Sequence, residues 1–203
     1  MIKLYGLSSS RALRSLWMLD ELGLEYENVP THFANGATRT PEFLKLNPNG
    51  HIPVLQDGET VIWESMAINL YLARKYGPAL WPKTVEDEGR AFQWSFWAMT
   101  ELEEPVITAL VNRRVLPEAE RSEKRAAAAV ERAAKPLGVL DGALEGRKHL
   151  LGDGFTVADL NVACALYRCN NMDFGPKTNL ARWYKACWER PAAKKARQMR
   201  ESS

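Results

Sequence analysis

The chain has 203 residues, 46% of them hydrophobic and 26% charged, which is the composition of a globular protein with one large or two small domains. Its 27 basic and 25 acidic residues give a formal net charge of +2, which provides no electrostatic basis for binding nucleic acid or an anionic membrane surface. No segment approaches the roughly 20 apolar residues that a transmembrane helix needs. The sequence has three cysteines, Cys164, Cys169 and Cys187. Their spacing is not that of metal ligands and their number is odd, which favours free thiols in the cytoplasm.

Short strand patterns alternate with helical ones up to about residue 80. Strands are expected at four places: Ile2–Tyr5, Glu25–Val29, Ile52–Gln56 and Thr60–Trp63. Helical patterns occur at three: Leu13–Leu22, Pro41–Leu46 and Ser65–Tyr76. Gly23 stands where a helix C-cap glycine belongs, and Asp57-Gly58 is a strong hairpin signal. The order β-α-β-α-β-β-α predicts a mixed sheet with helices on its faces.

The strand patterns stop after a proline-bearing segment around residues 78–85, which is expected to link a domain at 1–80 to a second domain at 86–203. The second domain is predicted to be all-α, with helices at Asp87–Asn112, at Ser122–Leu144 with a kink at Pro136, from Thr156, and at Asn179–Glu189. The basic stretch Lys194–Arg197 is interpreted as a solvated helix end. Thr156 and Asp159 form a capping-box pattern, a structural feature that contributes about 1 kcal/mol per cap bond.

The Ile52-Pro53 step opens an apolar strand, and proline cannot donate to a sheet ladder. A trans bond that merely begins the strand is the expectation from these residues alone, because cis is a small minority of X–Pro bonds. A cis bond would instead turn the backbone N–H and C=O of Ile52 outward, where they could pair with an extended peptide ligand.

Glu64-Ser65 lies at a strand-to-helix junction. Ser65 as the helix N-cap is the simpler interpretation. Alternatively, the free N–H groups of the helix start and the Ser65 hydroxyl match an amino acid carboxylate, while the Glu64 carboxylate matches its ammonium group.

A polar segment, Ser8-Ser9-Ser10-Arg11, connects the first expected strand to the first expected helix. Its side chains are either helix caps or the place where chemistry occurs.

Taken together, these segments resemble the glutathione transferase family over nearly the whole chain. The matching phrases are the Ser8–Ser10 cluster, LDELGLEYE (Leu19–Glu27), NPNGHIPVL (Asn47–Leu55), ESMAI (Glu64–Ile68) and FTVAD (Phe155–Asp159). The resemblance implies a thioredoxin-like N-terminal domain, an all-α C-terminal domain and a homodimer. It also implies a cis bond before Pro53 and glutathione as co-substrate.

The resemblance further assigns roles in glutathione binding. The Ile52 backbone would pair with the cysteinyl part, and Glu64 and Ser65 would hold the γ-glutamyl end. His51 would lie near the glycyl carboxylate, assisted by Arg39 or Lys45.

In this family a hydroxyl between the first strand and the first helix activates the glutathione thiol. Ser9 fits that position best, with Ser10 as the alternative and Ser8 third. Arg11 is either close to the sulfur or second substrate, or a surface side chain. Since a hydroxyl and a helix N-terminus suffice to stabilise a thiolate, no metal is expected. The implied reaction is attack on a hydrophobic electrophile. The alternatives are a glutathione-dependent disulfide or peroxide reductase, and a non-catalytic binding module.

Overall fold

The computed structural model describes residues 1–169 and 176–202. They form two compact units, Met1–Trp81 with Glu189–Ser203, and Pro82–Trp188. The sequence-based division assigned everything from residue 86 onward to the helical domain. In the structure the last segment of the chain belongs instead with the first unit, because its helix packs against the first helix of the chain.

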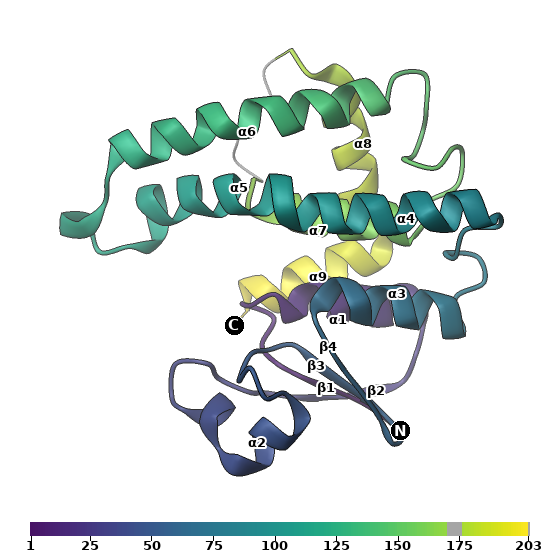
Figure 1. Ribbon diagram of the computed structural model, residues 1–203, viewed down its shortest axis with the longest axis vertical. Helices are drawn as coiled ribbons and strands as arrows, with labels where there is room; N and C mark the ends of the chain where they lie inside the picture. Colours follow the sequence, from purple (N-terminus) through teal and green to yellow (C-terminus); the bar gives the residue numbers. More distant parts are fainter. Residues whose placement is uncertain (170–175, 203) are drawn as a thin grey trace. The chain divides into compact units, whose positions relative to one another are not determined.

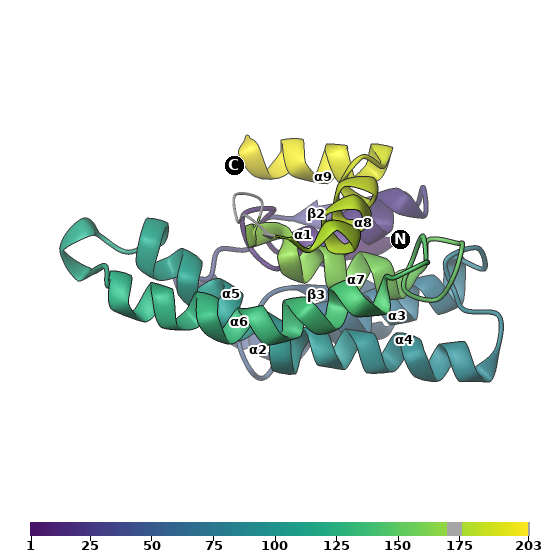
Figure 2. The same cartoon turned by 90° about the horizontal axis from the view of Figure 1, so that it is seen from above.

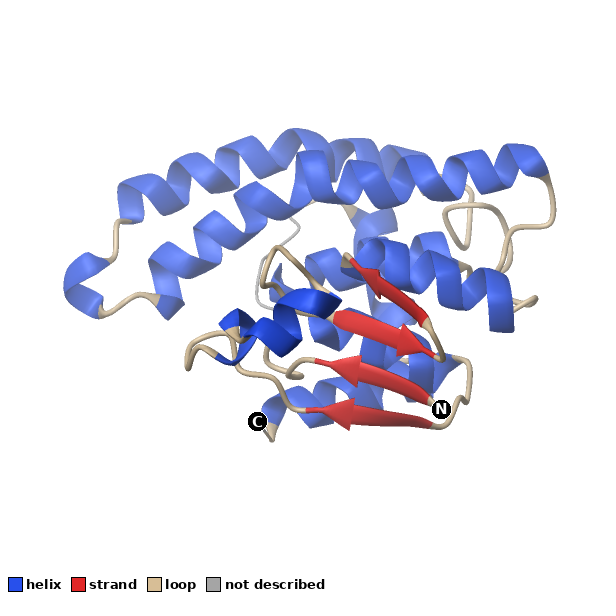
Figure 3. Cartoon of the chain, turned by 60° about the horizontal axis from the view of Figure 1, so that its bottom comes forward, coloured by secondary structure: helices blue, strands red, loops and turns tan. Residues whose placement is uncertain are grey.

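A four-stranded mixed sheet forms the centre of the first unit, as predicted. It contains β1 (Ile2–Tyr5), β2 (Tyr26–Val29), β3 (Val54–Asp57) and β4 (Thr60–Trp63), in the order β2-β1-β3-β4 (Figure 3). β1 and β2 are parallel, whereas β1 with β3 and β3 with β4 are antiparallel. The hairpin expected at Asp57-Gly58 is present, since Asp57 pairs with Thr60 across a two-residue loop.

Helices cover both faces of this sheet. α1 (Ala12–Glu21) and α3 (Ser65–Tyr76) lie on one face, and α2 (Pro41–Leu46) lies on the other (Figure 1). α1 is followed, as predicted, by Gly23, whose φ of +63° lets its own N–H and that of Leu24 bond back to the carbonyl groups of Asp20 and Leu19. The apolar sides of sheet and helices are fully buried: Leu4, Leu16, Leu55, Ile68 and Leu72.

The C-terminal helix α9 (Pro191–Glu201) is an element that the sequence analysis missed. Its basic stretch 194–197 lies inside this helix, which begins with proline in its first turn. α9 lies beside α1 in both views (Figures 1 and 2) and buries Ala193 and Ala196 completely. Two alanines one turn apart allow this close packing, and the exposed basic side chains around them obscured the apolar stripe.

In the described part of the second unit, all of the longer regular elements are helices, as predicted. It comprises α4 (Val85–Trp97), α5 (Glu103–Leu110), α6 (Glu123–Ala143), α7 (Val157–Ala165) and α8 (Thr178–Trp188). α5 and α6 lie side by side (Figures 1 and 2). α6 runs through Pro136 without ending there.

The long helix expected over 87–112 is present as an unbroken helical run over 85–115, but its two changes of helical type were not predicted. π-helical segments, Ala98–Leu102 and Val111–Val115, flank α5. Pro105 explains the first of them, because its nitrogen carries no hydrogen for the Glu101 carbonyl and its ring crowds that carbonyl. The periodicity of apolar residues continues across the interruption, so the pattern alone did not reveal it.

The capping box at the start of α7 is confirmed. Asp159 is completely buried and accepts hydrogen bonds from the backbone N–H groups of Thr156 and Leu150 and from the indole of Trp183. One carboxylate therefore joins the helix start, the preceding loop and α8.

Among the described residues, no helix combines the length and the apolar composition needed to cross a membrane. The cytoplasmic location stays a prediction from the sequence.

Candidate functional site

The three serines after β1, here called the serine turn (Ser8–Ser10), make different contacts. Ser8 is half-buried, and its Oγ donates to the carbonyl oxygen of Met199 in α9 at 2.9 Å. Ser10 starts the first helix: its Oγ donates to the Leu7 carbonyl at 2.7 Å and accepts from the N–H of Ala12 at 3.1 Å. The Ser10 hydroxyl is therefore occupied by hydrogen bonds at the start of α1, and the Ser8 hydroxyl by its hydrogen bond to α9.

Ser9 differs from both neighbours. Its side chain is exposed, and within residues 1–169 and 176–202 its hydroxyl has no hydrogen-bond partner. The helix α1 begins three residues later, with the exposed Arg11 in the N-cap position. A free hydroxyl thus stands just before the N-terminus of a helix, where the helix dipole favours negative charge.

The Ile52-Pro53 bond is cis, as the family resemblance implied. Neither the N–H nor the carbonyl oxygen of Ile52 has a partner in the described part of the chain. Ile52 also lies beside the serine turn, because a Cβ placed on Gly6 would be 2.6 Å from the Cβ of Ala12 and 3.5 Å from that of Ile52. The absence of a side chain at Gly6 allows the start of α1 and the cis-proline loop to approach each other.

Glu64 and Ser65 open α3, but not in the simplest expected way. Glu64, not Ser65, occupies the N-cap position, so the interpretation of Ser65 as the cap is wrong. Glu64 has φ +73° and ψ +114°, a sparsely populated conformation for a residue with a side chain. Its carboxylate is exposed and has no partner among the described residues.

Ser65 is buried, and its Oγ accepts a hydrogen bond of 3.2 Å from Nη1 of Arg14. Arg14 is a residue that the sequence analysis missed. It lies on α1 next to Leu13 and one turn before Trp17 and Met18, all of which are buried. A basic residue in the middle of a buried helical stripe was the available signal, because such a charge needs a polar partner inside the fold.

The residues expected at the glycyl end lie around the loop before β3. Nη1 of Arg39 donates to the carbonyl oxygen of Asn49 at 3.4 Å, which places its guanidinium two residues from the exposed His51. Lys45 is exposed on α2, and no contact joins it to Arg39 or His51. Basic side chains at this loop suit a ligand carboxylate.

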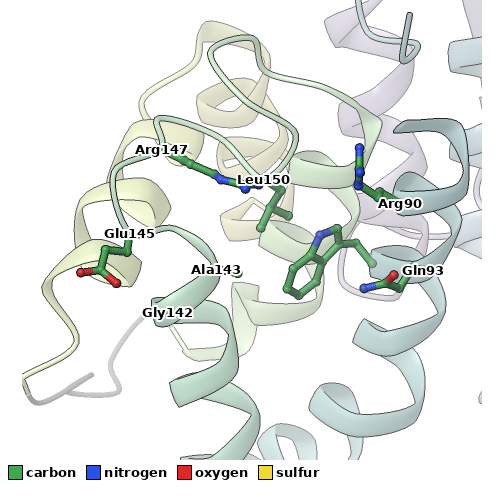
Figure 4. Close-up of a pocket in the computed structure, with 8 residues that line it drawn as sticks. Arg90, Gln93, Gly142, Ala143, Glu145, Arg147 and Leu150 are labelled. Atoms are coloured by element: carbon green, nitrogen blue, oxygen red, sulfur yellow. The ribbon is translucent and has the colours of Figure 1, made fainter. Parts of the chain in front are cut away.

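A separate cavity of about 390 Å³ lies in the second unit. Arg90 and Arg147 stand on opposite sides of it, whereas Glu145 points away (Figure 4). None of the residues expected to bind glutathione lines this cavity. No group of three or more His, Cys, Asp or Glu side chains in the described residues could hold a metal ion.

The mixed sheet of order β2-β1-β3-β4, with helices on both faces and a cis-proline before β3, is a thioredoxin-like fold. The family model described as "Glutathione S-transferase, N-terminal domain" matches residues 1–74, and the one described as "Glutathione S-transferase, C-terminal domain" matches residues 101–191. The chain belongs to the glutathione S-transferase family.

Individual relatives agree with this assignment. Glutathione S-transferase GstB of Escherichia coli (strain K12) is 33% identical over 201 residues, covering 96% of this chain and 97% of that protein. Glutathione S-transferase 3 of Zea mays is 38% identical over 209 residues, covering 96% and 90%. The solved theta class glutathione S-transferase of Xanthomonas axonopodis pv. citri, with glutathione bound, matches with a TM-score of 0.90 and 31% identity over 96% of each chain.

Proposed function

We propose that this transferase joins glutathione to a hydrophobic electrophile, with the Ser9 hydroxyl donating to the thiolate sulfur. One observation carries the choice of Ser9: of the three serines, it has the exposed hydroxyl without a partner in the described residues. Ser8 and Ser10 already hold other parts of the fold. A donor must be free to reach the sulfur, so Ser9 is favoured over both.

The energies are sufficient for this mechanism. A free thiol has a pKa of about 8.5, and lowering it by about 2 units takes about 2.7 kcal/mol of preferential thiolate stabilisation. A hydrogen bond to a charged group supplies roughly 1.5–3 kcal/mol, and a helix N-terminus adds roughly 0.3–1 kcal/mol. Ser9 and the start of α1 together therefore suffice without a protein base.

The rest of the site supports binding of the peptide around that sulfur. The backbone N–H and C=O of Ile52 would pair with the cysteinyl unit, as in strand addition. Glu64 would pair with the γ-glutamyl ammonium group, and the N-terminus of α3 with its carboxylate. Arg39 and His51 would meet the glycyl carboxylate. The unusual backbone of Glu64 supports this role, because strained residues persist where they are functionally required.

Conjugation of glutathione to a chlorinated dinitrobenzene tests the proposal. Ser9→Ala should lower kcat/KM at neutral pH by about 10-fold to 100-fold, the loss of one hydrogen bond to a charged group. Ser10→Ala should mainly reduce stability. Activity that falls only in Ser10→Ala would move the donor to Ser10. Strong activity on a glutathione mixed disulfide with none on aryl halides would favour the reductase, and failure to bind immobilised glutathione would favour the binding module.

We also propose a homodimer, on the basis of apolar side chains that α4 leaves exposed. Phe92 and Phe96 lie one turn apart and are 39% and 64% exposed. Large exposed apolar side chains on one helix face favour a protein partner. Light scattering at low micromolar concentration should give twice the mass of the chain, and Phe96→Asp should shift it toward the monomer. A wild-type monomer would overturn this proposal.

A further inference from the structure

Two hydrogen bonds join the C-terminal end of α9 to the first residue of the serine turn. The Oγ of Ser8 donates to the carbonyl oxygen of Met199 at 2.9 Å. In return, Nη1 of Arg200 donates to the carbonyl oxygen of Ser8 at 3.1 Å. These residues are 191 and 192 positions apart in the sequence. We call this pair of bonds the Ser8–Arg200 latch.

The rest of α9 holds the latch in place. Arg190, just before the helix, forms an ion pair with Glu21 at the far end of α1. Lys195 pairs with Asp20 at 2.6 Å. The two helices therefore run antiparallel along each other, and the last turn of α9 is fixed at the beginning of α1.

Each bond of the latch satisfies a group that its own element leaves unpaired. The last four carbonyl groups of a helix have no intrahelical donor, and that of Met199 is one of them. The Ser8 carbonyl lies in a turn outside the sheet and receives a donor that carries a full positive charge, which makes the bond stronger than a neutral one. The latch thus stabilises the turn by contacts that the first 80 residues alone do not provide.

We propose that the latch positions Ser9, so that Ser8 and Arg200 are positioning residues of the transferase reaction. Ser8 directly precedes Ser9, and Ser10, which follows it, is fixed by its hydrogen bonds to the Leu7 carbonyl and the Ala12 N–H. With both neighbours held, the turn presents the middle hydroxyl in one place. A hydrogen bond weakens steeply with misalignment, so freeing one side of the turn weakens donation to the sulfur. In this proposal Ser8 forms the latch, Ser9 donates to the sulfur, and Ser10 fixes the start of α1.

This inference rests on the proposed function, and its test keeps the two separate. The variants are Arg200→Ala and Ser8→Ala, with Lys194→Ala as the matched control, because Lys194 is exposed on the same helix and its side chain has no polar partner among the described residues. The measurements are the pH dependence of kcat/KM for conjugation and calorimetric binding of glutathione.

Each latch variant should raise the apparent pKa of bound glutathione by about one unit and lower kcat/KM at neutral pH by about 10-fold. The loss should disappear at pH values above the ordinary thiol pKa of about 8.5. Affinity for glutathione should stay within about twofold of the wild type, because its peptide contacts lie elsewhere. The effects of the two substitutions should be less than additive, since both loosen the same contact.

Lys194→Ala should leave the pH profile unchanged. An unchanged profile in both latch variants, with wild-type conjugation intact, would overturn the latch and leave the proposed function standing. A shifted profile in Ser8→Ala alone would identify Ser8 as the donor and also contradict the latch. If the wild type itself neither binds nor conjugates glutathione, the proposed function fails.

Discussion

The guanidinium of Arg14 donates a hydrogen bond of 3.2 Å to the Oγ of Ser65 and so joins α1 to the first residue of α3. Arg14 is only 5% exposed. Its backbone carbonyl also accepts from the side chain of Asn69 at 3.4 Å. The helix that follows the serine turn is therefore tied by a buried cation to the helix start where the γ-glutamyl group is proposed to bind.

Replacing Arg14 with methionine tests this connection. The substitution leaves the buried Ser65 hydroxyl without its donor, so the free energy of unfolding should fall by about 1–3 kcal/mol. Affinity for glutathione should fall as well, because the start of α3 loses its support. Denaturant unfolding and calorimetry measure the two effects. Arg125→Met, an exposed arginine on α6, is the control. Equal glutathione affinity in both variants would show that Arg14 does not support the binding site.

Two substitutions at Glu64 distinguish the effect of its carboxylate on glutathione binding from the effect of its backbone strain on stability. Glu64→Ala and Glu64→Gly remove the same carboxylate, so both should weaken glutathione binding by about tenfold, as expected for one charged hydrogen bond. Only glycine relieves the positive φ, so the glycine variant should be more stable than the alanine variant by about 1 kcal/mol. Chemical unfolding of the two variants checks this. If alanine proves the more stable, the backbone at Glu64 is not strained.

The β3–β4 hairpin is attached to α3 through Asp57, which gives a prediction about pH. Its carboxylate accepts hydrogen bonds from Tyr71 at 2.8 Å, Tyr76 at 2.7 Å and Lys75 at 2.7 Å. Burial raises the pKa of Asp57, but the hydrogen bonds donated by Lys75, Tyr76 and Tyr71 outweigh burial and hold the pKa below its usual value. The hydrogen bond to Asp57 in turn raises the pKa of Lys75.

Because the folded pKa of Asp57 is lowered, its stabilisation is complete above the unfolded value of about 3.9 and is lost as the pH falls through the folded value. Lys75 has a raised folded pKa, so its stabilisation is complete below about 10.4 and is lost as the pH rises beyond that. Asp57→Asn should therefore lower stability near pH 7, and the difference from the wild type should shrink below about pH 4. Glu59→Gln on the same hairpin is the control. A difference that stays constant from pH 7 to pH 2 would contradict this account.

Substitution of Asp159 should lower the free energy of unfolding more than any other single substitution in the second unit. Asp159→Ala leaves two buried donors, on Leu150 and Trp183, and the partly buried N–H of Thr156 unpaired, so the expected cost is about 3–5 kcal/mol. Asp153→Ala, an exposed residue in the preceding loop, should cost less than about 0.5 kcal/mol. Urea unfolding of both variants measures the difference, and a loss below about 1 kcal/mol at Asp159 would remove its central role.

Local sequence patterns were sufficient to predict most of the secondary structure of the first unit. Turn residues and short alternations predicted its four strands and three of its helices within a few residues, because glycine and proline mark the ends of those elements. The cis bond before Pro53 was different. The residues alone favoured trans, and only the family resemblance implied cis.

Long-range packing explains what was missed. α9 has a weak apolar stripe of alanines, and its partner α1 lies about 180 residues earlier in the chain, so no local signal indicated that the two pack together. The contact of Ser8 with Met199, 191 positions away, was hidden for the same reason, and that of Arg14 with Ser65 also joins segments distant in the sequence, 51 positions apart. The π-helical segments beside α5 were missed because the apolar period continues across them.

The ionisation of bound glutathione tests the central claim most directly, since Ser9 is proposed to act on the thiolate itself. The thiolate absorbance of the enzyme–glutathione complex, titrated with pH, gives the pKa in the wild type, Ser9→Ala and Ser10→Ala. The wild type should ionise about 2 units below the free thiol at about 8.5, and Ser10→Ala, which frees one side of the serine turn, should raise the pKa by no more than about one unit. Ser9→Ala should return most of the way to the free value. A depressed pKa that persists in Ser9→Ala would contradict the account.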